Sequence, residues 1–168
     1  MVKWRIKMSE IEIDESLAKL VTRGGIYYGV SGASSGEIMS NVISALPAMP
    51  SLKKDALLQA VMEREALIST GKENGVALPH PRTPMLKDGE EPFAAIAFPL
   101  STPDWDTPDN SKVHTVFLIV SKSPKQHLSV LSRINVLCQH ENVFNLIKDR
   151  APREAIIRAI EEAEKTWG

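Results

Sequence analysis

The residues of this chain best suited to chemistry are its four histidines, His80, His114, His127 and His140. No two of them are separated by three or four residues, the spacing that places two metal ligands on one face of a helix. The single cysteine, Cys138, can form neither an internal disulfide nor a Cys-x-x-Cys metal or redox pair. The sequence therefore predicts no metal site, and nothing in it calls for a cofactor.

His80 differs from the other histidines because its backbone is constrained on both sides. It lies in the run Pro79-His80-Pro81, directly after the apolar segment 76–78, which is too short to be anything but a brief buried strand. Its ring is therefore expected to be held at the edge of a sheet. A histidine of ordinary pKa, about 6.5, is mostly neutral at pH 7 and can attack phosphorus or a carbonyl carbon without a separate base. A fixed imidazole is therefore a usable nucleophile, but the spacing taken alone still favours a structural histidine.

Other side chains could complete a phosphate site around this histidine. His127 opens a predicted helix over 126–139, where free backbone amides attract anions. Arg64 could supply a bidentate charge partner, or it could be a solvated charge between Glu63 and Glu65. Two hydroxyls in the following loop could donate hydrogen bonds. The residues assigned to this site are His80, His127, Arg64, Ser69 and Thr70.

The remaining candidates have structural explanations. Residues 32–36 match the Gly-x-Ser-x-Gly motif of serine hydrolases, between a predicted strand and a predicted helix. Ser34 is better explained as a helix cap, because no second glycine-rich segment offers an oxyanion hole. His114 lies in a predicted strand and His140 at the end of a predicted helix, where partly buried or capping histidines are common. We assign neither histidine a role.

The hydrophobic pattern predicts a fold in which helices flank strands. We expect strands at 26–30, 76–78, 93–98 and 113–120, and helices from Ser34 or Ser35 to 46, from Ser51 to about 65, at 125–139, at 143–147 and from Pro152 onward. This order predicts one α/β domain, a mixed β-sheet flanked by helices on both faces. We assign 26–168 to this domain and 1–25 to an N-terminal extension or arm, in which 4–13 alternate as an extended segment does.

Composition and charge exclude several classes of protein. The 168 residues, 43% hydrophobic and 24% charged, suit one globular domain. A net charge of −1 gives no electrostatic footprint for nucleic acid or an anionic membrane. The longest apolar run, 93–100, is far shorter than a membrane span, and the N-terminus lacks the apolar run of a signal peptide. We therefore expect a cytoplasmic protein without direct membrane insertion or nucleic-acid partners.

Three runs resemble, in order and spacing, the phosphorylation-site signature of a known family: Glu63-Arg64-Glu65, Ser69-Thr70-Gly71 and the run from Asn74 to His80. This family is the second type of enzyme IIA domain of the bacterial phosphoenolpyruvate-dependent phosphotransferase system, in its fructose, mannitol and nitrogen-regulatory branch. The segments from Asp109 to Val113 and from His127 to Ile134 are similar to the family's later strand entry and its second-histidine helix. The resemblance extends from about residue 26 to the C-terminus.

The resemblance implies a role in phosphoryl transfer. It implies that His80 takes a phosphoryl group on a ring nitrogen, that His127 hydrogen-bonds this group and that Arg64 helps to hold its charge. It implies a histidine phosphocarrier protein, or its nitrogen-branch relative, as donor, and an enzyme IIB cysteine or regulated proteins as acceptor or target. The chain would then be a nitrogen-type regulator or a free-standing sugar-specific component.

The chain departs from the family pattern directly after His80. The family usually has a small residue there, most often glycine, whereas this chain has Pro81 followed by Arg82. Proline removes a backbone donor close to the expected phosphoryl group. The alternative interpretation is therefore a domain of the same fold that binds partners without being phosphorylated.

Overall fold

A four-stranded mixed sheet forms the centre of the molecule. The computed structural model describes residues 15–167, so the predicted extended segment 4–13 lies outside the described residues. The strands are β1 (Ile26–Val30), β2 (Val76–Ala77), β3 (Phe93–Pro99) and β4 (Thr115–Val120), in the order β1-β3-β4-β2. The outer strands β1 and β2 run parallel to their neighbours, whereas the central pair, β3 and β4, is antiparallel.

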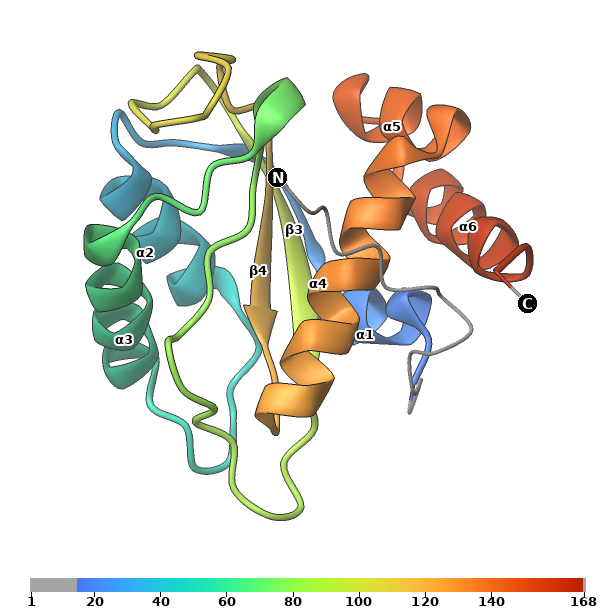
Figure 1. Ribbon diagram of the computed structural model, residues 1–168. Helices are drawn as coiled ribbons and strands as arrows, with labels where there is room; N and C mark the ends of the chain where they lie inside the picture. The colour runs from blue at the N-terminus through green and yellow to red at the C-terminus, as the bar shows by residue number, and fades with distance from the viewer. Residues whose placement is uncertain (1–14, 168) are drawn as a thin grey trace, which may run out of the picture.

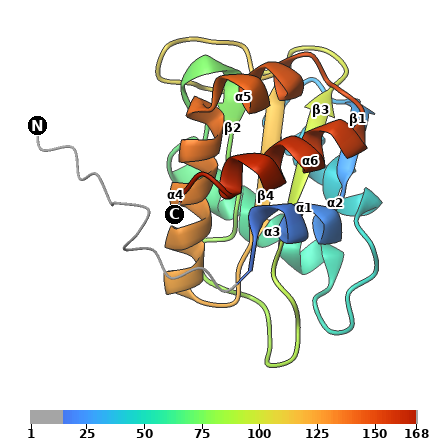
Figure 2. The same cartoon turned by 90° about the vertical axis from the view of Figure 1, so that its right-hand side faces the viewer.

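Helices cover both faces of this sheet. They are α1 (Leu17–Gly24), α2 (Ser35–Ala45), α3 (Lys54–Leu67), α4 (Pro124–Gln139), α5 (Glu141–Lys148) and α6 (Arg153–Glu164), with a single 3-10 turn at Glu73–Gly75. Helices α2 and α3 lie on one side of the sheet, opposite α4 (Figure 1), and Figure 2 shows α1, α5 and α6 on the α4 side. The predicted α/β fold, a mixed sheet flanked by helices on both faces, is confirmed. No helix within residues 15–167 is long and apolar enough to cross a membrane.

The two central strands are buried on both faces. Along β3, Ile96 and Phe98 belong to the core shared with α1, α4, α5 and α6, while Ala95 and Ala97 belong to the core shared with α2 and α3. Successive residues of a strand point to opposite faces, so a strand covered on both sides reads as a continuous apolar run. This explains why the sequence indicated β3 and β4 without an alternating pattern.

Serine caps fix where two of the helices begin. The Ser34 hydroxyl accepts from the Glu37 amide at 3.2 Å at the start of α2. At the start of α4, the Ser123 hydroxyl accepts from the Gln126 amide at 3.1 Å, and Pro124 occupies the first helical turn. These contacts satisfy amides that a helix leaves free at its N-terminus. The predicted Ser51 cap is wrong, because α3 begins at Lys54 without a side-chain cap.

Helix α1 is the element that the sequence did not predict. It falls within the predicted extension 1–25, but Leu17, Leu20 and Val21 are buried and pack into the core beneath β3 and α6. A Cβ atom added to Gly24 would lie 2.2 Å from the Ala94 carbonyl oxygen, so the helix end presses directly on β3. Residues 17–24 are therefore part of the domain. Sequence reasoning missed a signal here, because Leu17, Leu20, Val21 and Gly24 follow the i, i+3, i+4, i+7 spacing of an amphipathic helix after the cap Ser16.

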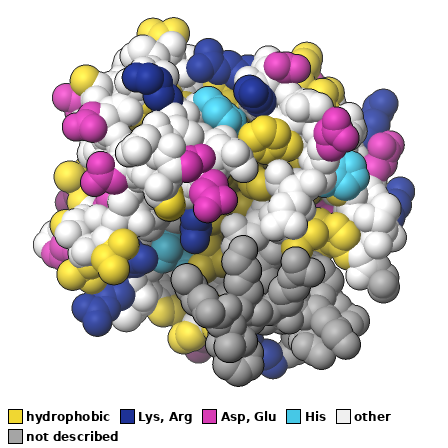
Figure 3. Space-filling view, turned by 45° about the horizontal axis from the view of Figure 1, so that its top comes forward, with side chains coloured by type: hydrophobic (Ala, Val, Ile, Leu, Met, Phe, Trp, Pro, Cys, Tyr) yellow, Lys and Arg dark blue, Asp and Glu magenta, His cyan; other side chains and the backbone are white. Residues whose placement is uncertain are grey.

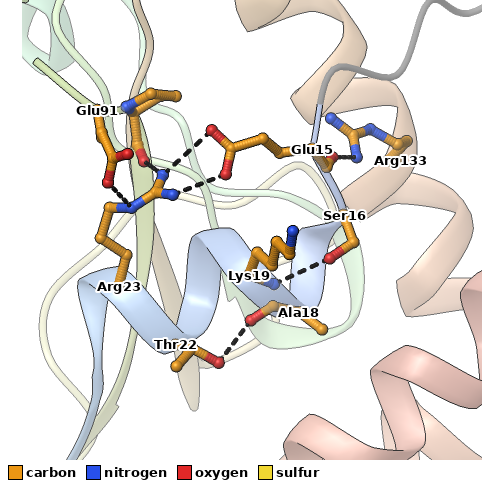
Figure 4. Close-up of polar contacts among 9 residues, drawn as sticks. Glu15, Ser16, Ala18, Lys19, Thr22, Arg23, Glu91 and Arg133 are labelled. Carbon is orange, nitrogen blue, oxygen red and sulfur yellow. Dashed lines mark hydrogen bonds and ion pairs between the residues drawn. The ribbon is translucent and has the colours of Figure 1, made fainter. Parts of the chain in front are cut away.

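Polar contacts of the Glu164 carboxylate and the Arg133 guanidinium fasten α1 to the rest of the molecule. The Glu164 carboxylate of α6 accepts from the amides of Leu17 and Ala18, at 2.9 and 3.0 Å. The guanidinium of Arg133, only 1% exposed, lies 4.0 Å from the same carboxylate and donates to the Glu15 carbonyl at 2.6 Å. Figure 4 shows the contact of Arg133 with the Glu15 carbonyl. It also shows the Arg23 guanidinium, which pairs with the carboxylates of Glu15 and Glu91. Helices α1, α4 and α6 are thus joined at one point.

Replacing Glu164 should weaken the fold measurably. We expect Glu164→Ala to lower the free energy of unfolding by about 2–3 kcal/mol, because two helix amides and a buried guanidinium lose their acceptor. Glu164→Gln should cost less, since an amide oxygen still accepts. Urea denaturation measures both, with the exposed Glu162→Ala on the same helix as a control expected within about 0.5 kcal/mol of wild type. Equal stability of Glu164→Ala and Glu162→Ala would contradict this role.

Candidate functional site

The position and orientation of His80 follow from the short strand β2. β2 pairs with β4, and the Pro79 carbonyl accepts from the Ile119 amide at 3.1 Å, so the chain stays beside β4 up to His80. The His80 ring is 9% exposed, and its Nδ1 lies 2.7 Å from the Leu78 carbonyl oxygen. A carbonyl oxygen only accepts, so Nδ1 carries the proton and Nε2 keeps its lone pair. The fold therefore leaves Nε2 of His80 as the unprotonated ring nitrogen.

The structure brings His127 directly to His80. The two ring centroids are 4.4 Å apart with an interplanar angle of 47°. Burial lowers the pKa of His80 below its usual value of 6.5, and the nearby charge of Arg64 adds to this effect, while the bond to Leu78 opposes it. Burial, followed by the charges of His80 and Arg64, lowers the pKa of His127 to about 4. Both rings are therefore neutral at pH 7.

Arg64 completes a cluster with the two histidines. It lies in the last turn of α3 and is half-buried, and its Nη1 donates to the Ile68 carbonyl at 2.7 Å. Its charge lowers the pKa of both His80 and His127, so the guanidinium acts electrostatically on both rings. The structure thus assembles two neutral imidazoles and one fixed cation, an arrangement suited to a dianionic phosphoryl group.

Ser69 and Thr70, also expected to support the phosphate, are engaged elsewhere. The Ser69 hydroxyl donates to the Asp106 carbonyl at 2.7 Å and accepts from the Gly71 amide at 3.0 Å. The Thr70 hydroxyl donates to a Glu65 carboxylate oxygen at 2.5 Å. Each hydroxyl hydrogen is already donated within the loop that follows α3. Ser69 and Thr70 therefore stabilise the loop beside the site, and neither hydroxyl donates to the histidine pair.

Glu65 organises this loop, and sequence reasoning missed it. Its carboxylate accepts from the Thr70 amide and hydroxyl at 2.9 and 2.5 Å, and from Trp105 Nε1 at 2.8 Å. The Trp105 ring is 8% exposed, so Glu65 joins α3 to two loops in a partly buried setting. Arg64 donates to the Ile68 carbonyl of the same loop. Arg64 and Glu65, neighbours on α3, therefore both hold this loop in place. The spacing of a glutamate four residues before Ser-Thr is the signal that could have indicated this role.

His114 and His140 have structural roles. His114 Nε2 lies 2.8 Å from the Asn74 carbonyl and therefore donates to it, while Nδ1 lies 2.7 Å from the Thr115 hydroxyl. These contacts fasten the turn Glu73–Gly75 that leads into β2. His140 lies at the end of α4, as the sequence suggested, but its ring caps the beginning of α5, where it accepts from the Val143 amide at 3.5 Å.

A metal site and a serine-hydrolase triad each require several side chains in contact with one another. Among residues 15–167, no three or more His, Cys, Asp or Glu side chains gather as a metal site would require. The Ser34 hydroxyl accepts from the Glu37 amide, and no histidine in the same range hydrogen-bonds it. The serine-hydrolase triad is therefore not assembled in the described part of the chain.

Exposed apolar side chains occur on the two helices that carry Arg64 and His127. They come from the end of α3 and from the first turns of α4: Met62 is 43% exposed, Leu67 60%, Ile68 73% and Leu128 61%. Exposed leucine and isoleucine side chains gathered around a site are typical of a surface that meets another protein. On the face that Figure 3 shows, acidic and basic side chains are interspersed, so this face carries no large area of one charge.

NMR can test the protonation state of the cluster. The nitrogen chemical shifts of His80 at pH 7 should show a protonated Nδ1 and an unprotonated Nε2. We expect His80 to titrate below pH 6.5 and His127 near pH 4. Arg64→Met should raise both pKa values, because it removes a cation that disfavours imidazolium. Titration of His127 near pH 6.5, or no response of either ring to Arg64→Met, would contradict the assigned geometry.

The role of Glu65 can be tested separately. Glu65→Gln should destabilise the protein by about 1–3 kcal/mol, because an amide cannot accept from the Thr70 hydroxyl and Trp105 Nε1 together. The indole N–H resonance of Trp105 should shift and its exchange with solvent should accelerate. Glu63→Gln, at an exposed position of the same turn, is the matched control and should leave this resonance unchanged. An unshifted Trp105 resonance in Glu65→Gln would count against the role.

Comparison with known proteins identifies relatives that share this arrangement of elements. The family model described as "Phosphoenolpyruvate-dependent sugar phosphotransferase system, EIIA 2" matches residues 20–163. The Nitrogen regulatory protein of Pseudomonas aeruginosa is 23% identical over 151 residues, which cover 88% of this chain and 96% of that protein. The mannitol-specific enzyme IIA component of Staphylococcus aureus is 27% identical, with 88% and 99% covered.

Other relatives differ in length or are known as structures. The chain is 26% identical to the fructose-specific EIIABC component of Bacillus subtilis, but it spans only 24% of that protein. The crystal structure of the nitrogen regulatory protein IIA-Ntr from Neisseria meningitidis superposes with a TM-score of 0.73 at 21% identity, covering 85% of this chain and 97% of that one. Since the family model extends from α1 to α6 and includes the His80 cluster, the chain belongs to the EIIA type-2 family of the phosphoenolpyruvate-dependent sugar phosphotransferase system.

Proposed function

We propose that this protein is a phosphocarrier that accepts a phosphoryl group on Nε2 of His80 and passes it on. The observation that carries the proposal is the bond from Nδ1 of His80 to the Leu78 carbonyl, which leaves Nε2 unprotonated beside His127 and Arg64. Membership of the EIIA family supports the same conclusion. The proposed donor is a phosphohistidine on a histidine phosphocarrier protein.

The proposed transfer needs no additional base. The Nε2 lone pair attacks phosphorus in line as the bond from phosphorus to the donor imidazole breaks, and the donor ring leaves with that electron pair. The His80 ring becomes cationic, and the Leu78 carbonyl that accepts from Nδ1 stabilises this charge. The Arg64 guanidinium and an N–H of His127 hold the phosphoryl oxygens. Positioning and charge stabilisation supply most of the catalysis in phosphoryl transfer.

The acceptor is proposed to be a second protein in the cytoplasm. One solved structural relative is a complex of mannitol enzyme IIA with phosphorylated enzyme IIB from Escherichia coli, and another relative is a nitrogen regulatory protein. We propose either an enzyme IIB cysteine or a regulated protein as the acceptor or target of this chain. The exposed Leu128 beside His127 supports transfer between proteins, because it offers apolar surface for docking.

A second candidate function is partner binding without phosphorylation. Pro81 favours it, because a proline directly after His80 cannot donate a backbone hydrogen bond to a bound phosphoryl group. The geometry of the histidine pair favours the phosphocarrier, since neither Nε2 of His80 nor the Arg64 charge depends on residue 81. The two functions differ in whether the protein gains phosphate.

Intact-mass analysis separates them. We mix the protein with phosphoenolpyruvate, enzyme I and either the sugar-branch or the nitrogen-branch histidine phosphocarrier. One acid-labile phosphoryl group should appear, should be absent in His80→Gln, and should form at least about tenfold more slowly in Arg64→Met. His140→Gln, at the opposite end of α4 from His127, is the matched control and should be phosphorylated as wild type is. No gain of mass with either carrier would contradict the phosphocarrier function and would leave partner binding without phosphorylation as the function.

The direction of onward transfer is the next measurement. Phosphorylated protein is mixed with fructose- or mannitol-type enzyme IIB, and loss of its phosphoryl group is followed by mass. Rapid transfer to an enzyme IIB cysteine would identify a sugar-specific component. Retention of the phosphoryl group, together with capture of a partner that binds only His80→Ala or only the phosphorylated form, would identify a regulator.

A further inference from the structure

A pocket lies between the loop that joins α2 to α3 and the segment that leads from His80 into β3. It has a volume of about 250 Å3, and the end of α1 forms one of its walls. In Figure 1 both loops lie at the lower end of the molecule. None of its described lining residues belongs to the proposed phosphate site. An occupant of this pocket would therefore be separate from the transferred phosphoryl group.

The walls of this pocket are mainly apolar. Leu46 and Phe93 are buried in the core shared with α2 and α3, whereas Met49 and Leu86, which pack against that core, are only partly buried. An apolar cavity of about 150 Å3 already binds benzene, so this pocket has room for one large aromatic side chain. A side chain that filled it would extend the core and remove further apolar surface from water.

The rim of the pocket carries more negative than positive charge. Its charged lining residues are Arg23 and the pair Glu90-Glu91. The Arg23 guanidinium already pairs with Glu91 at 2.9 Å and with Glu15 at 2.7 Å, so one cation serves two carboxylates (Figure 4). The Glu91 side chain remains 68% exposed. The other charges of this loop, at 87 and 88, have opposite signs. A basic occupant therefore suits this rim best.

The described part of the chain begins at this rim. Glu15 is its first residue, and the Glu15 carboxylate is bound to Arg23, which lines the pocket. The 14 residues before Glu15 would span about 46–50 Å when fully extended, so the pocket lies well within their reach. A segment joined by so short a link has an effective concentration of the order of mM at the pocket. A separate molecule would have to compete with it.

The first eight residues of the chain complement both the walls and the rim. They contain Lys3, Arg5 and Lys7 and no acidic residue, whereas residues 9–14 contain three acidic residues and no basic one. Trp4 is the largest apolar side chain of this segment, and it stands between two of the cations. Neighbouring side chains of an extended segment point to opposite sides, but lysine and arginine are long enough to reach back to a rim.

We propose that the N-terminal segment of this chain binds across the pocket, with the Trp4 indole inside it and Lys3 and Arg5 beside Glu90-Glu91. The bound segment covers the exposed parts of the apolar walls and holds the loop 86–91 against the end of α1. This loop continues the chain from His80 to β3, so the segment also restricts the backbone that follows His80. The inference concerns the unphosphorylated protein and does not depend on the proposed function.

NMR of the full-length protein can locate the Trp4 indole. Its ring protons should show nuclear Overhauser effects to the methyl groups of Met49 and Leu86. Trp4→Leu should shift these methyl resonances, because it removes the ring current of the indole, and should leave the Ile134 methyls of the opposite core unchanged. Ile11→Leu, in the acidic half of the same segment, is the matched control and should shift none of them.

Hydrogen exchange tests the charge pairing at the rim. The amides of Lys87 and Glu90 are bonded within the loop, at 2.8 and 3.0 Å. They should exchange at least about fivefold faster in the double variant Lys3→Glu/Arg5→Glu, because like charges release the segment that holds this loop. Arg158→Glu/Lys165→Glu, two exposed charge reversals on α6 and at its end, is the matched control and should leave both exchange rates unchanged.

Three outcomes would overturn the inference. Without nuclear Overhauser effects from Trp4 to Met49 or Leu86, the segment does not occupy the pocket. In a mixture of isotope-labelled and unlabelled protein, effects found only between two molecules would show that the occupant is the segment of a second copy. Exchange rates that are equal in wild type and Lys3→Glu/Arg5→Glu would show that the rim does not recognise the basic residues. Each result is independent of whether His80 accepts a phosphoryl group.

Discussion

The hydrogen bond from Nδ1 of His80 to the Leu78 carbonyl is the constraint on which the site depends. It spans only two residues, and it joins the His80 ring to the backbone of the segment that lies beside β4. The parallel pairing of β2 with β4 and the amide of Ile119 hold this segment in place. A ring fixed in this way has one protonated and one free nitrogen without the help of a charged partner. The short strand therefore selects the tautomer that can act as a nucleophile.

Two connecting segments, the loop after α3 and the turn before β2, are held in place by hydrogen bonds of their own. Glu65 fixes the loop after α3 through Thr70 and Trp105, and His114 fixes the turn before β2 through the Asn74 carbonyl. Neither residue hydrogen-bonds His80, but together they set where α3 ends and where β2 begins. The fixed surroundings mean that the charged groups need little reorganisation when a phosphoryl group arrives, which is the condition for effective electrostatic stabilisation.

The sequence predicted those features whose signal lies within a few neighbouring residues. The apolar runs of β3 and β4 are visible because both faces of each strand are buried, and the position of His80 follows from its flanking prolines. The sequence predicted that the hydroxyls of Ser69 and Thr70 donate to the phosphate, because it does not show their actual acceptors. The acceptor of Ser69, the Asp106 carbonyl, is 37 residues away. Helix α1 differs, because its apolar spacing is visible locally, and only its contact with Glu164 at the far end of the chain cannot be read from neighbouring residues.

The proline after His80 affects both the proposed chemistry and the backbone of the site. It removes one backbone donor from the vicinity of the proposed phosphoryl group, a loss that Arg64 and His127 can compensate because both act through side chains. At the same position it fixes the backbone angle φ of a buried residue, which a glycine would leave free. Compared with the glycine usual in the family, the chain therefore has one backbone donor fewer and a stiffer backbone directly after His80.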